Sequence, residues 1–260
     1  MAKTENRTAI EDYLKVIFSL GEWQDETVSN AAVAARLGVS TSSVSEMARK
    51  LADNGLVAHK RYGGMRLTDE GLEQALQMVR RHRLVETFLV TSLGYAWDEV
   101  HDDAEVLEHA VSTLMVERMD TQLGHPWRDP HGDPIPTADG VLHQPTAEPL
   151  ATTPVGERRF VARIDDDDPA LLRWLAETGI AVDAEVVVRE RKPFGGATRL
   201  DVRAPGAAVD GHLVAELGDQ AVAALLVSVE PASPTPLNAK GCHYSDCRHI
   251  GAPRVSEKNR

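Results

Sequence analysis

The chain has 260 residues, of which 42% are hydrophobic and 5% aromatic, and a formal net charge of −12. This length allows one large domain or two to three small ones, and the apolar content is that of a globular protein. No apolar signal segment follows the first methionine, and the longest apolar stretch, about residues 220–229, is too short to cross a bilayer. We therefore expect a cytoplasmic protein with no membrane partner.

The negative charge is unevenly distributed along the chain. Residues 1–92 contain 12 Lys+Arg and 12 Asp+Glu, whereas residues 93–150 contain 2 Lys+Arg and 12 Asp+Glu. A general basic patch, the usual electrostatic sign of a nucleic-acid-binding protein, is absent. The acidic middle segment instead favours the binding of divalent cations.

The first part of the chain has the pattern of a winged helix-turn-helix. Apolar residues recur at spacings of three and four within residues 10–18, which predicts a helix with one buried face. Hydroxyl caps and a closing glycine predict a short helix within residues 29–38. A further helix follows, with Ser43 and Glu46 spaced as a capping box. Residues 56–68 then predict a β-hairpin, the wing.

Two longer helices and a proline-rich stretch are predicted next. Thr68 is placed to cap a helix that runs toward Thr91. After a break at residues 94–97, apolar periodicity predicts one helix through residues 100–114. Residues 124–154 contain seven prolines, and we expect them to form a loop and linker.

The pattern changes again near the carboxyl terminus. Residues 186–188 and 199–203 predict strands, and residues 171–178 predict a short helix. These elements indicate a small β-barrel-like domain. The segment after Pro231 is expected to be a flexible tail. The predicted fold class is therefore mainly α with a small β component.

Six potential metal ligands lie on the two central helices. A helix places residues i, i+3 and i+4 on one face, so each helix carries one stripe of ligands. Nitrogen and oxygen donors without a thiolate favour Mn²⁺ or Fe²⁺ over a structural zinc site. The alternative is that these residues are solvated charges and helix caps. The six residues are His82, Glu86, His101, Glu105, Glu108 and His109.

Several motifs in the order of the chain resemble the diphtheria toxin repressor family, and in particular its manganese transport regulators. The resemblance covers about residues 8–140, and residues 155–230 look like the SH3-like (FeoA-like) carboxyl-terminal domain of the longer family members. The motifs are Glu11-Asp12-Tyr13-Leu14, Val44-Ser45, Leu67-Thr68 with Gly71, Arg81-His82-Arg83-Leu84 with Glu86, Trp97-Asp98-Glu99-Val100-His101, Glu105-Val106-Leu107-Glu108-His109 and Asp133-Pro134-Ile135-Pro136.

The resemblance implies a manganese-dependent transcriptional repressor, not an enzyme, that binds palindromic operator DNA as a metal-activated homodimer and controls manganese uptake genes. An iron-dependent repressor of the same family is the alternative, and Zn²⁺ or Co²⁺ are expected to substitute in vitro. It also implies a winged helix-turn-helix domain at residues 1–72, a helical metal-binding and dimerisation domain at 73–145, an SH3-like domain at 150–230 and a tail at 231–260.

The resemblance implies two metal positions. His82, Glu86 and His101 match the ancillary position, and the activating position corresponds to Asp12, Glu105, Glu108 and His109. Iron-sensing relatives have Met and Cys where this chain has Asp12 and Glu105, so hard oxygen donors favour Mn²⁺.

One residue departs from the pattern of the short manganese regulators. Lys15 stands where those proteins have a second acidic residue, which argues against their binuclear site. The three-domain arrangement implies a further ligand from the third domain, and Asp165 or Asp166 is the candidate. The alternative is that this acidic run caps the helix that begins at Pro169.

The family places the second helix of the helix-turn-helix in the major groove of DNA. Short hydroxyls at its start suit phosphate hydrogen bonds, and basic residues in the helix and the wing reach the backbone. A carboxylate among them can accept a hydrogen bond from cytosine. Plain solvation is the alternative for each. The candidate DNA-binding residues are Ser40, Thr41, Ser42, Ser43, Glu46, Arg49, Lys50, Lys60, Arg61 and Arg66.

Two other function classes remain as alternatives. A metalloenzyme would use an open metal site for hydrolysis, but the chain has no His-Glu-x-x-His motif. A metal buffer would bind Mn²⁺ without reading a specific duplex. In the tail, Cys242, His243, Cys247 and His249 have a spacing that is only weakly typical of a small zinc site.

Overall fold

The computed structural model describes residues 2–23, 27–59, 64–208 and 211–233. These residues divide into two compact units, and the boundary falls within one long helix. Unit 1 contains residues 2–81 and 136–142, and unit 2 contains residues 82–135 and 143–233. None of the described helices is both long and apolar enough to cross a membrane.

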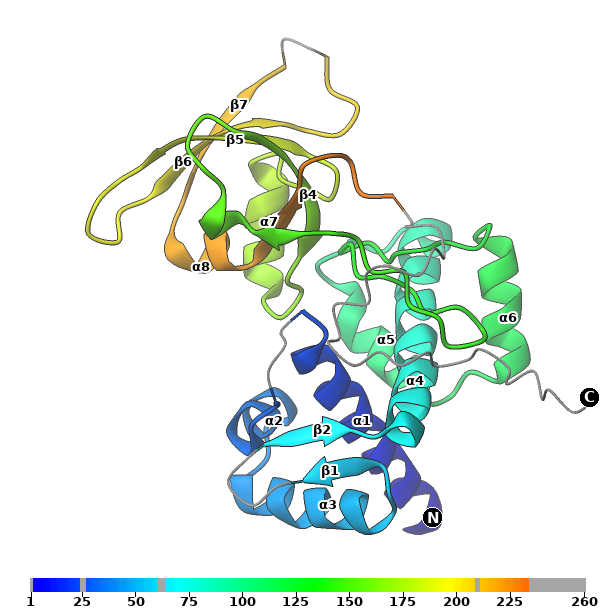
Figure 1. Ribbon diagram of the computed structural model, residues 1–260. Coiled ribbons are helices and arrows are strands. Elements are labelled where there is room, and N and C mark those ends of the chain that lie inside the picture. Colours follow the sequence, from blue (N-terminus) through cyan, green and yellow to red (C-terminus); the bar gives the residue numbers. More distant parts are fainter. Residues whose placement is uncertain (1, 24–26, 60–63, 209–210, 234–260) are drawn as a thin grey trace, which may run out of the picture. The chain divides into compact units, whose positions relative to one another are not determined.

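Unit 1 is a winged helix-turn-helix, as predicted (Figure 1). Three helices precede a two-stranded antiparallel hairpin, and a fourth helix begins directly after it. The elements are α1 (Ala2–Gly21), α2 (Asn30–Leu37), α3 (Thr41–Asp53), β1 (Val57–His59), β2 (Met65–Leu67) and the start of α4 (Asp69–Phe88). One apolar core joins them, and its fully buried residues include Leu14, Val33, Val44, Leu51 and Met65.

The helix ends in unit 1 follow local sequence signals. The Ser29 side chain accepts a hydrogen bond from the Ala32 amide and caps α2. Gly38 ends α2 with a φ of 64°, a left-handed conformation that glycine adopts without steric cost. Thr68 accepts from the amide of Gly71 at 3.1 Å and so caps α4, as predicted.

The predicted capping box at the start of α3 is wrong. Ser40, with extended backbone at φ −75° and ψ 149°, is the residue that caps the helix, and its hydroxyl accepts from the Ser43 amide at 3.1 Å. Ser43 therefore lies within the first turn, so its spacing to Glu46 has no capping role. The helix begins earlier than the pattern suggested because Ser40 directly follows the turn.

The helical part of unit 2 differs from the prediction in one respect. Residues 100–114 do not form one helix. The chain leaves α5 after Glu108, and Ser112 caps a new helix by accepting from the Met115 amide at 3.2 Å. Apolar periodicity continues through the break, so it cannot reveal the cap. The elements are the end of α4, a π-helical turn η1 (Leu89–Leu93), α5 (Val100–Glu108) and α6 (Thr113–Gln122).

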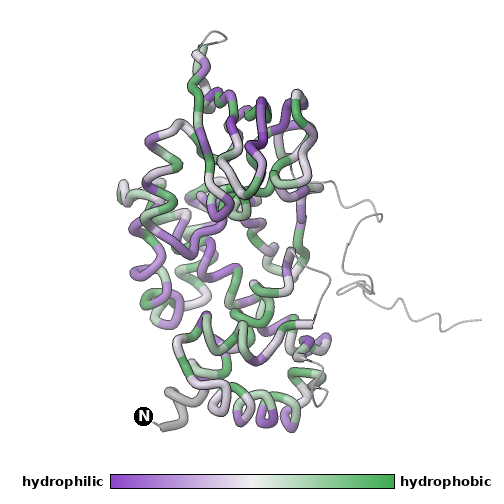
Figure 2. Tube along the Cα trace, turned by 90° about the vertical axis from the view of Figure 1, so that its left-hand side faces the viewer, coloured by the Kyte–Doolittle hydropathy of each residue, from purple (hydrophilic) through white to green (hydrophobic). Residues whose placement is uncertain are grey.

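The rest of unit 2 is the predicted SH3-like fold. Six antiparallel strands form one sheet in the order β3-β8-β4-β5-β6-β7. Leu172 and Leu175, which lie on helix α7, pack into the core of this sheet. The elements are β3 (Glu148–Pro149), the 3₁₀ turn η2 (Leu150–Thr152), β4 (Arg158–Ile164), α7 (Pro169–Glu177), β5 (Glu185–Arg191), β6 (Thr198–Arg203), β7 (Leu213–Leu217), α8 (Asp219–Ala223) and β8 (Leu225–Ser228). Figure 2 shows hydrophobic and hydrophilic residues alternating along these helices and strands, as amphipathic packing requires.

The proline-rich stretch is irregular, as predicted, but the description of it as a linker is wrong for its first part. Asp129 and residues 131–136 are buried, and Pro130 is half-buried. His131, with 1% of its surface exposed, packs inside unit 2. The predicted tail beyond residue 233 lies outside the described residues, and so do Lys60 and Arg61.

Candidate metal centre

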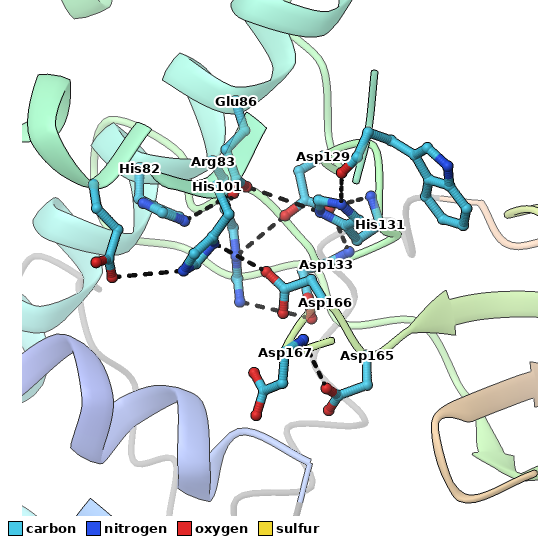
Figure 3. A network of polar contacts seen from close by, with 12 residues as sticks. His82, Arg83, Glu86, His101, Asp129, His131, Asp133, Asp165, Asp166 and Asp167 are labelled. Carbon is cyan, nitrogen blue, oxygen red and sulfur yellow. Dashed lines mark hydrogen bonds and ion pairs between the residues drawn. The ribbon is translucent and has the colours of Figure 1, made fainter. Parts of the chain in front are cut away.

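Residues on α4 and α5 form the centre of a polar cluster (Figure 3). His82 and Glu86 lie one turn apart on α4, and His101 lies in the first turn of α5. Glu86 Oε1 is 3.0 Å from His82 Nε2 and 3.2 Å from His101 Nδ1. These three side chains place one potential ligand atom each within 4.8 Å of one another. The same-face spacing seen in the sequence places His82 and Glu86 together, and the packing of α5 adds His101, so the three predicted ancillary residues meet.

Glu108, the last residue of α5, also lies in this cluster. It is fully buried, and its Oε2 is 2.5 Å from His82 Nδ1, while its Oε1 is 3.4 Å from His109 Nε2. Glu105 is exposed, with Oε1 3.6 Å from His101 Nε2. The imidazole of His82 therefore lies between Glu86, which belongs to the predicted ancillary position, and Glu108, which belongs to the predicted activating position.

The fourth residue of the predicted activating position is Asp12, which is half-buried on α1. It belongs to unit 1, whereas Glu105, Glu108 and His109 belong to unit 2. The assembly of these four residues around one metal ion therefore stays a prediction.

The residues of the acidic run ahead of α7 have different partners. Asp166 Oδ2 is 3.4 Å from His101 Nδ1, so Asp166 joins the cluster (Figure 3). Asp165 instead pairs with Arg163 at 3.5 Å and accepts from the Asp167 amide at 3.1 Å. Asp168 caps α7 by accepting from the amides of residues 170 and 171. The capping alternative is thus confirmed for Asp168, whereas ligation of a metal ion by Asp166 stays a prediction.

His131 was missed in the sequence and lies at the heart of the cluster. Its Nε2 is 2.7 Å from the Trp97 carbonyl oxygen, which can only accept, so Nε2 carries a proton. Its ring stacks on Trp97 with a centroid distance of 5.8 Å. Its Nδ1 is buried, has no hydrogen-bond partner among the described residues, and lies 4.0 Å from Glu86 Oε2.

This buried nitrogen fits a metal ligand. Glu86, His131 and Asp166 form a second group whose ligand atoms lie within 4.8 Å of one another. A buried ring nitrogen without a hydrogen bond costs free energy unless a cation or another partner satisfies it. The backbone carbonyl on the far nitrogen is the usual device that sets the tautomer of a metal-binding histidine.

A signal for His131 does exist in the sequence. It lies between two carboxylates in the segment Asp129-Pro-His131-Gly-Asp133. The prolines and glycine around it are typical of a turn. Because a turn has no helical or strand periodicity, the pattern of the sequence does not show that these three polar side chains are buried.

The cluster has strongly perturbed electrostatics. Burial would raise the pKa of Glu86, but the adjacent His82 and His101 lower it well below its usual range. Burial would also raise the pKa of Asp166, but hydrogen bonding to His101 and the charges around it lower that pKa as well. Burial lowers the pKa of His101, yet Asp166, Glu105 and Glu86 outweigh it and raise the pKa to about 12.

The segment around His131 is also perturbed. Burial and the charge of Asp133 raise the pKa of Asp129 to about 7, against the opposing effects of His131 and Arg83. Burial lowers the pKa of His131, but Asp129, Asp166 and Glu86 raise it overall. Carboxylates thus surround both His101 and His131. Protons on these two histidines supply positive charge that a bound divalent cation would supply instead.

The donor set is suited to a divalent metal ion. The two groups, which share Glu86, together offer three imidazoles, those of His82, His101 and His131, and two carboxylates, those of Glu86 and Asp166. No cysteine occurs among the described residues. Oxygen and imidazole donors suit Mn²⁺, Fe²⁺ and Zn²⁺, and the absence of sulfur removes a preference for soft ions.

The predicted DNA-binding residues lie on α3 and β2 of unit 1. Thr41, Ser42, Ser43, Glu46 and Arg49 are exposed on α3, and Arg66 is exposed on β2. Lys50 is half-buried. The Ser40 hydroxyl is engaged in capping and lies 2.7 Å from that of Ser42 and 2.9 Å from that of Ser43. Contact of these residues with DNA stays a prediction.

Three family models match the chain in succession. They are the iron dependent repressor, N-terminal DNA binding domain, at residues 7–65; the iron dependent repressor, metal binding and dimerisation domain, at residues 68–137; and the FeoA domain at residues 148–229. Because repressors rather than enzymes make up this family, the metalloenzyme alternative does not apply.

Individual relatives agree with these models but differ in their metal. The iron-dependent repressor IdeR of Mycobacterium tuberculosis is 32% identical over 201 residues, which cover 72% of this chain and 86% of that protein. The diphtheria toxin repressor of Corynebacterium glutamicum is 33% identical over 187 residues, covering 68% and 81%. A solved manganese-dependent transcriptional repressor in complex with manganese is 49% identical, with a TM-score of 0.78, covering 84% and 98%. The chain therefore belongs to the diphtheria toxin repressor family of metal-dependent transcriptional repressors.

Proposed function

We propose that this repressor responds to Mn²⁺ and, when loaded, binds palindromic operator DNA as a homodimer to control manganese uptake genes. The observation that carries the proposal of a metal site is the buried Nδ1 of His131. This atom lies beside Glu86 and Asp166 and has no hydrogen-bond partner among the described residues. The hard donor set and the solved manganese-bound relative support Mn²⁺. Iron-dependent relatives make Fe²⁺ the alternative.

We further assign two roles to the ligands. Glu86, His101, His131 and Asp166 would hold one metal ion that joins the helical part of unit 2 to its SH3-like part, with His82 as a further candidate ligand. The activating metal position would use Asp12, Glu105, Glu108 and His109, and this proposal rests on the family resemblance. Residues 1–72, 73–145 and 150–230 would then read DNA, bind metal and dimerise, and complete the metal centre, respectively.

The proposed link to DNA is geometric. A dimer can occupy two half-sites only when its two recognition helices are about 34 Å apart, one turn of DNA. Binding of metal at the activating position would restrict where α1, and with it α3, can lie. Metal and DNA would then strengthen each other's binding by the same factor, typically 5- to 150-fold.

The test begins with a pool of random DNA duplexes, from which the protein selects a binding sequence in the presence of Mn²⁺. Fluorescence anisotropy then measures affinity for that duplex with Mn²⁺, with anaerobic Fe²⁺ and with a chelator. We expect tight binding with Mn²⁺ and weak binding with chelator, and we expect His131→Ala to need more Mn²⁺ for half-maximal binding. Equal affinity in all conditions would reject metal control, and no selected sequence would favour a metal buffer.

The identity of the metal has a separate test. Glu105→Cys introduces a soft thiolate at the activating position, which should shift the ranking of activating metals from Mn²⁺ toward Fe²⁺, Co²⁺ or Zn²⁺. The measurement is the concentration of each metal that gives half-maximal DNA binding. An unchanged ranking would contradict the argument that hard donors at this position select Mn²⁺.

A further inference from the structure

The short loop that carries His131 is held in shape by its own first carboxylate. Asp129 Oδ1 accepts from the amides of His131 and Asp133, each at 2.9 Å. Gly132 lies between them with a φ of 94°, a conformation that favours glycine. The loop therefore presents the His131 ring from a compact turn rather than from a regular element.

One arginine holds this loop from the side of α4. Arg83 is buried, and its Nη1 donates to the Pro134 carbonyl at 2.7 Å. Its guanidinium also lies 3.7 Å from Asp129 Oδ2 and 3.7 Å from Asp133 Oδ1 (Figure 3). Arg83 directly follows the candidate ligand His82 and lies three residues before Glu86 on the same helix, so it relates the loop to the helix that supplies these groups.

A second arginine holds the loop from the side of the SH3-like sheet. Arg163 on β4 donates through Nε to Asp133 Oδ1 at 2.7 Å. The amide of Ile164, the next residue, donates to the His131 carbonyl at 2.9 Å. A Cβ added to Gly132 would lie 2.2 Å from the Ala162 carbonyl oxygen, so the loop and the strand are in close contact.

Asp133 thus lies between two arginines from different elements, and the same strand β4 leads directly to Asp166. We infer that Asp133 and Arg163 are positioning residues of the metal centre: they fix His131 relative to Asp166, without themselves binding metal. This inference rests on the proposed function of Glu86, His131 and Asp166. Hydrogen-bonded partners behind metal ligands commonly change metal affinity by about 10–100-fold when they are removed.

The test uses the full-length chain with Asp12→Ala as background, so that metal binding reports on the unit 2 centre. In this background, Mn²⁺ affinity is measured by electron paramagnetic resonance, and the coordination environment by the visible absorption of bound Co²⁺. Asp133→Asn and Arg163→Gln are expected to weaken Mn²⁺ binding about 10- to 100-fold and to change the Co²⁺ spectrum. Arg163→Lys keeps the charge and should recover part of the affinity.

Arg173→Gln is the matched control. Arg173 also makes a 2.7 Å ion pair, with Asp98, between the SH3-like fold and the helical part of unit 2, but among the described residues no hydrogen bond or ion pair joins it to the loop. Its loss should leave Mn²⁺ affinity and the Co²⁺ spectrum unchanged. A purely structural role of Arg163 would lower the midpoint of thermal unfolding and leave both metal readouts as in the background protein, which would overturn the inference.

The failure of the inference is distinguishable from failure of the proposed metal centre. If Glu86→Ala abolishes Mn²⁺ binding in this background while Asp133→Asn and Arg163→Gln do not weaken it, the centre stands and the positioning role falls. If Glu86→Ala binds Mn²⁺ as the background does, the proposed centre itself is rejected. Should Arg163→Gln fail to fold, Asp133→Asn, which is nearly isosteric, and Arg163→Lys decide the matter.

Discussion

At this centre, the side chain of His101 lies close to three carboxylates. His101 is within 3.2 Å of Glu86, 3.4 Å of Asp166 and 3.6 Å of Glu105. Without metal, a protonated His101 neutralises part of this negative charge, which is why its pKa rises to about 12 although burial opposes the charge. A proton and a metal ion therefore compete for the same place.

This competition predicts the pH dependence of metal binding. A pKa of about 12 means that His101 carries its proton at pH 7, and it must lose this proton to bind a metal ion. Metal binding should release protons, and the affinity should rise as the pH increases from 6 to 8. Isothermal titration in buffers of different ionisation enthalpy counts the protons released. Binding without proton release would contradict the assignment of His101 as a ligand.

Between elements, close backbone contacts decide how the helices and strands of unit 1 fit. Gly71, in the first turn of α4, approaches the end of the helix-turn-helix so closely that an added Cβ would lie 1.9 Å from the Leu56 carbonyl oxygen. Thr68 reinforces this junction, because its hydroxyl donates to the Gly55 carbonyl at 2.6 Å and caps α4. The wing and α4 therefore depend on a small residue at this position.

Gly71→Ala should destabilise unit 1. The methyl group forces the start of α4 away from Leu56, and overpacking of this kind typically costs about 1–3 kcal/mol. The free energy of unfolding is measured by denaturant titration. Mn²⁺ affinity of the unit 2 centre serves as the internal control and should not change, since Gly71 belongs to unit 1. Unchanged stability would show that the junction relaxes without cost.

At the scale of the whole molecule, we expect exposed apolar side chains of unit 2 to meet a partner. Leu114 and Met115 on α6 are 60% and 48% exposed, and Val106 on α5 is 72% exposed. Exposed large apolar residues are typical of interaction surfaces. They lie within the region that matches a metal binding and dimerisation domain, so a second copy of the chain is the expected partner.

Leu114→Glu combined with Val106→Glu should convert the dimer to a monomer, because two charged carboxylates would be buried in each half of a two-fold interface. Sedimentation equilibrium measures the change. DNA affinity should fall with it, since one recognition helix then occupies a single half-site, while Mn²⁺ binding to each chain persists. A dimer that survives both changes would place the interface elsewhere.

Much of this fold was predictable because its signals are local. The caps Ser29 and Thr68 and the left-handed Gly38 act within a few residues of themselves, and helical spacing alone places His82 and Glu86 on one face of α4. The family motifs extended this to the order of the domains. The exact start of α3 was missed because neighbouring hydroxyls compete for one role, and Ser40 holds it.

The sequence by itself thus determined the wing, most of the helices and a small β domain at the carboxyl end, and it pointed to His82, Glu86 and His101, which the fold brings together. Only the tertiary structure decided that His131 completes the cluster and that Asp166, not Asp165, joins it. The reason is physical: burial of the His131 loop depends on Arg83 and Arg163, which lie on separate elements and meet Asp133 only after the chain has folded. No periodicity within the loop encodes those distant partners.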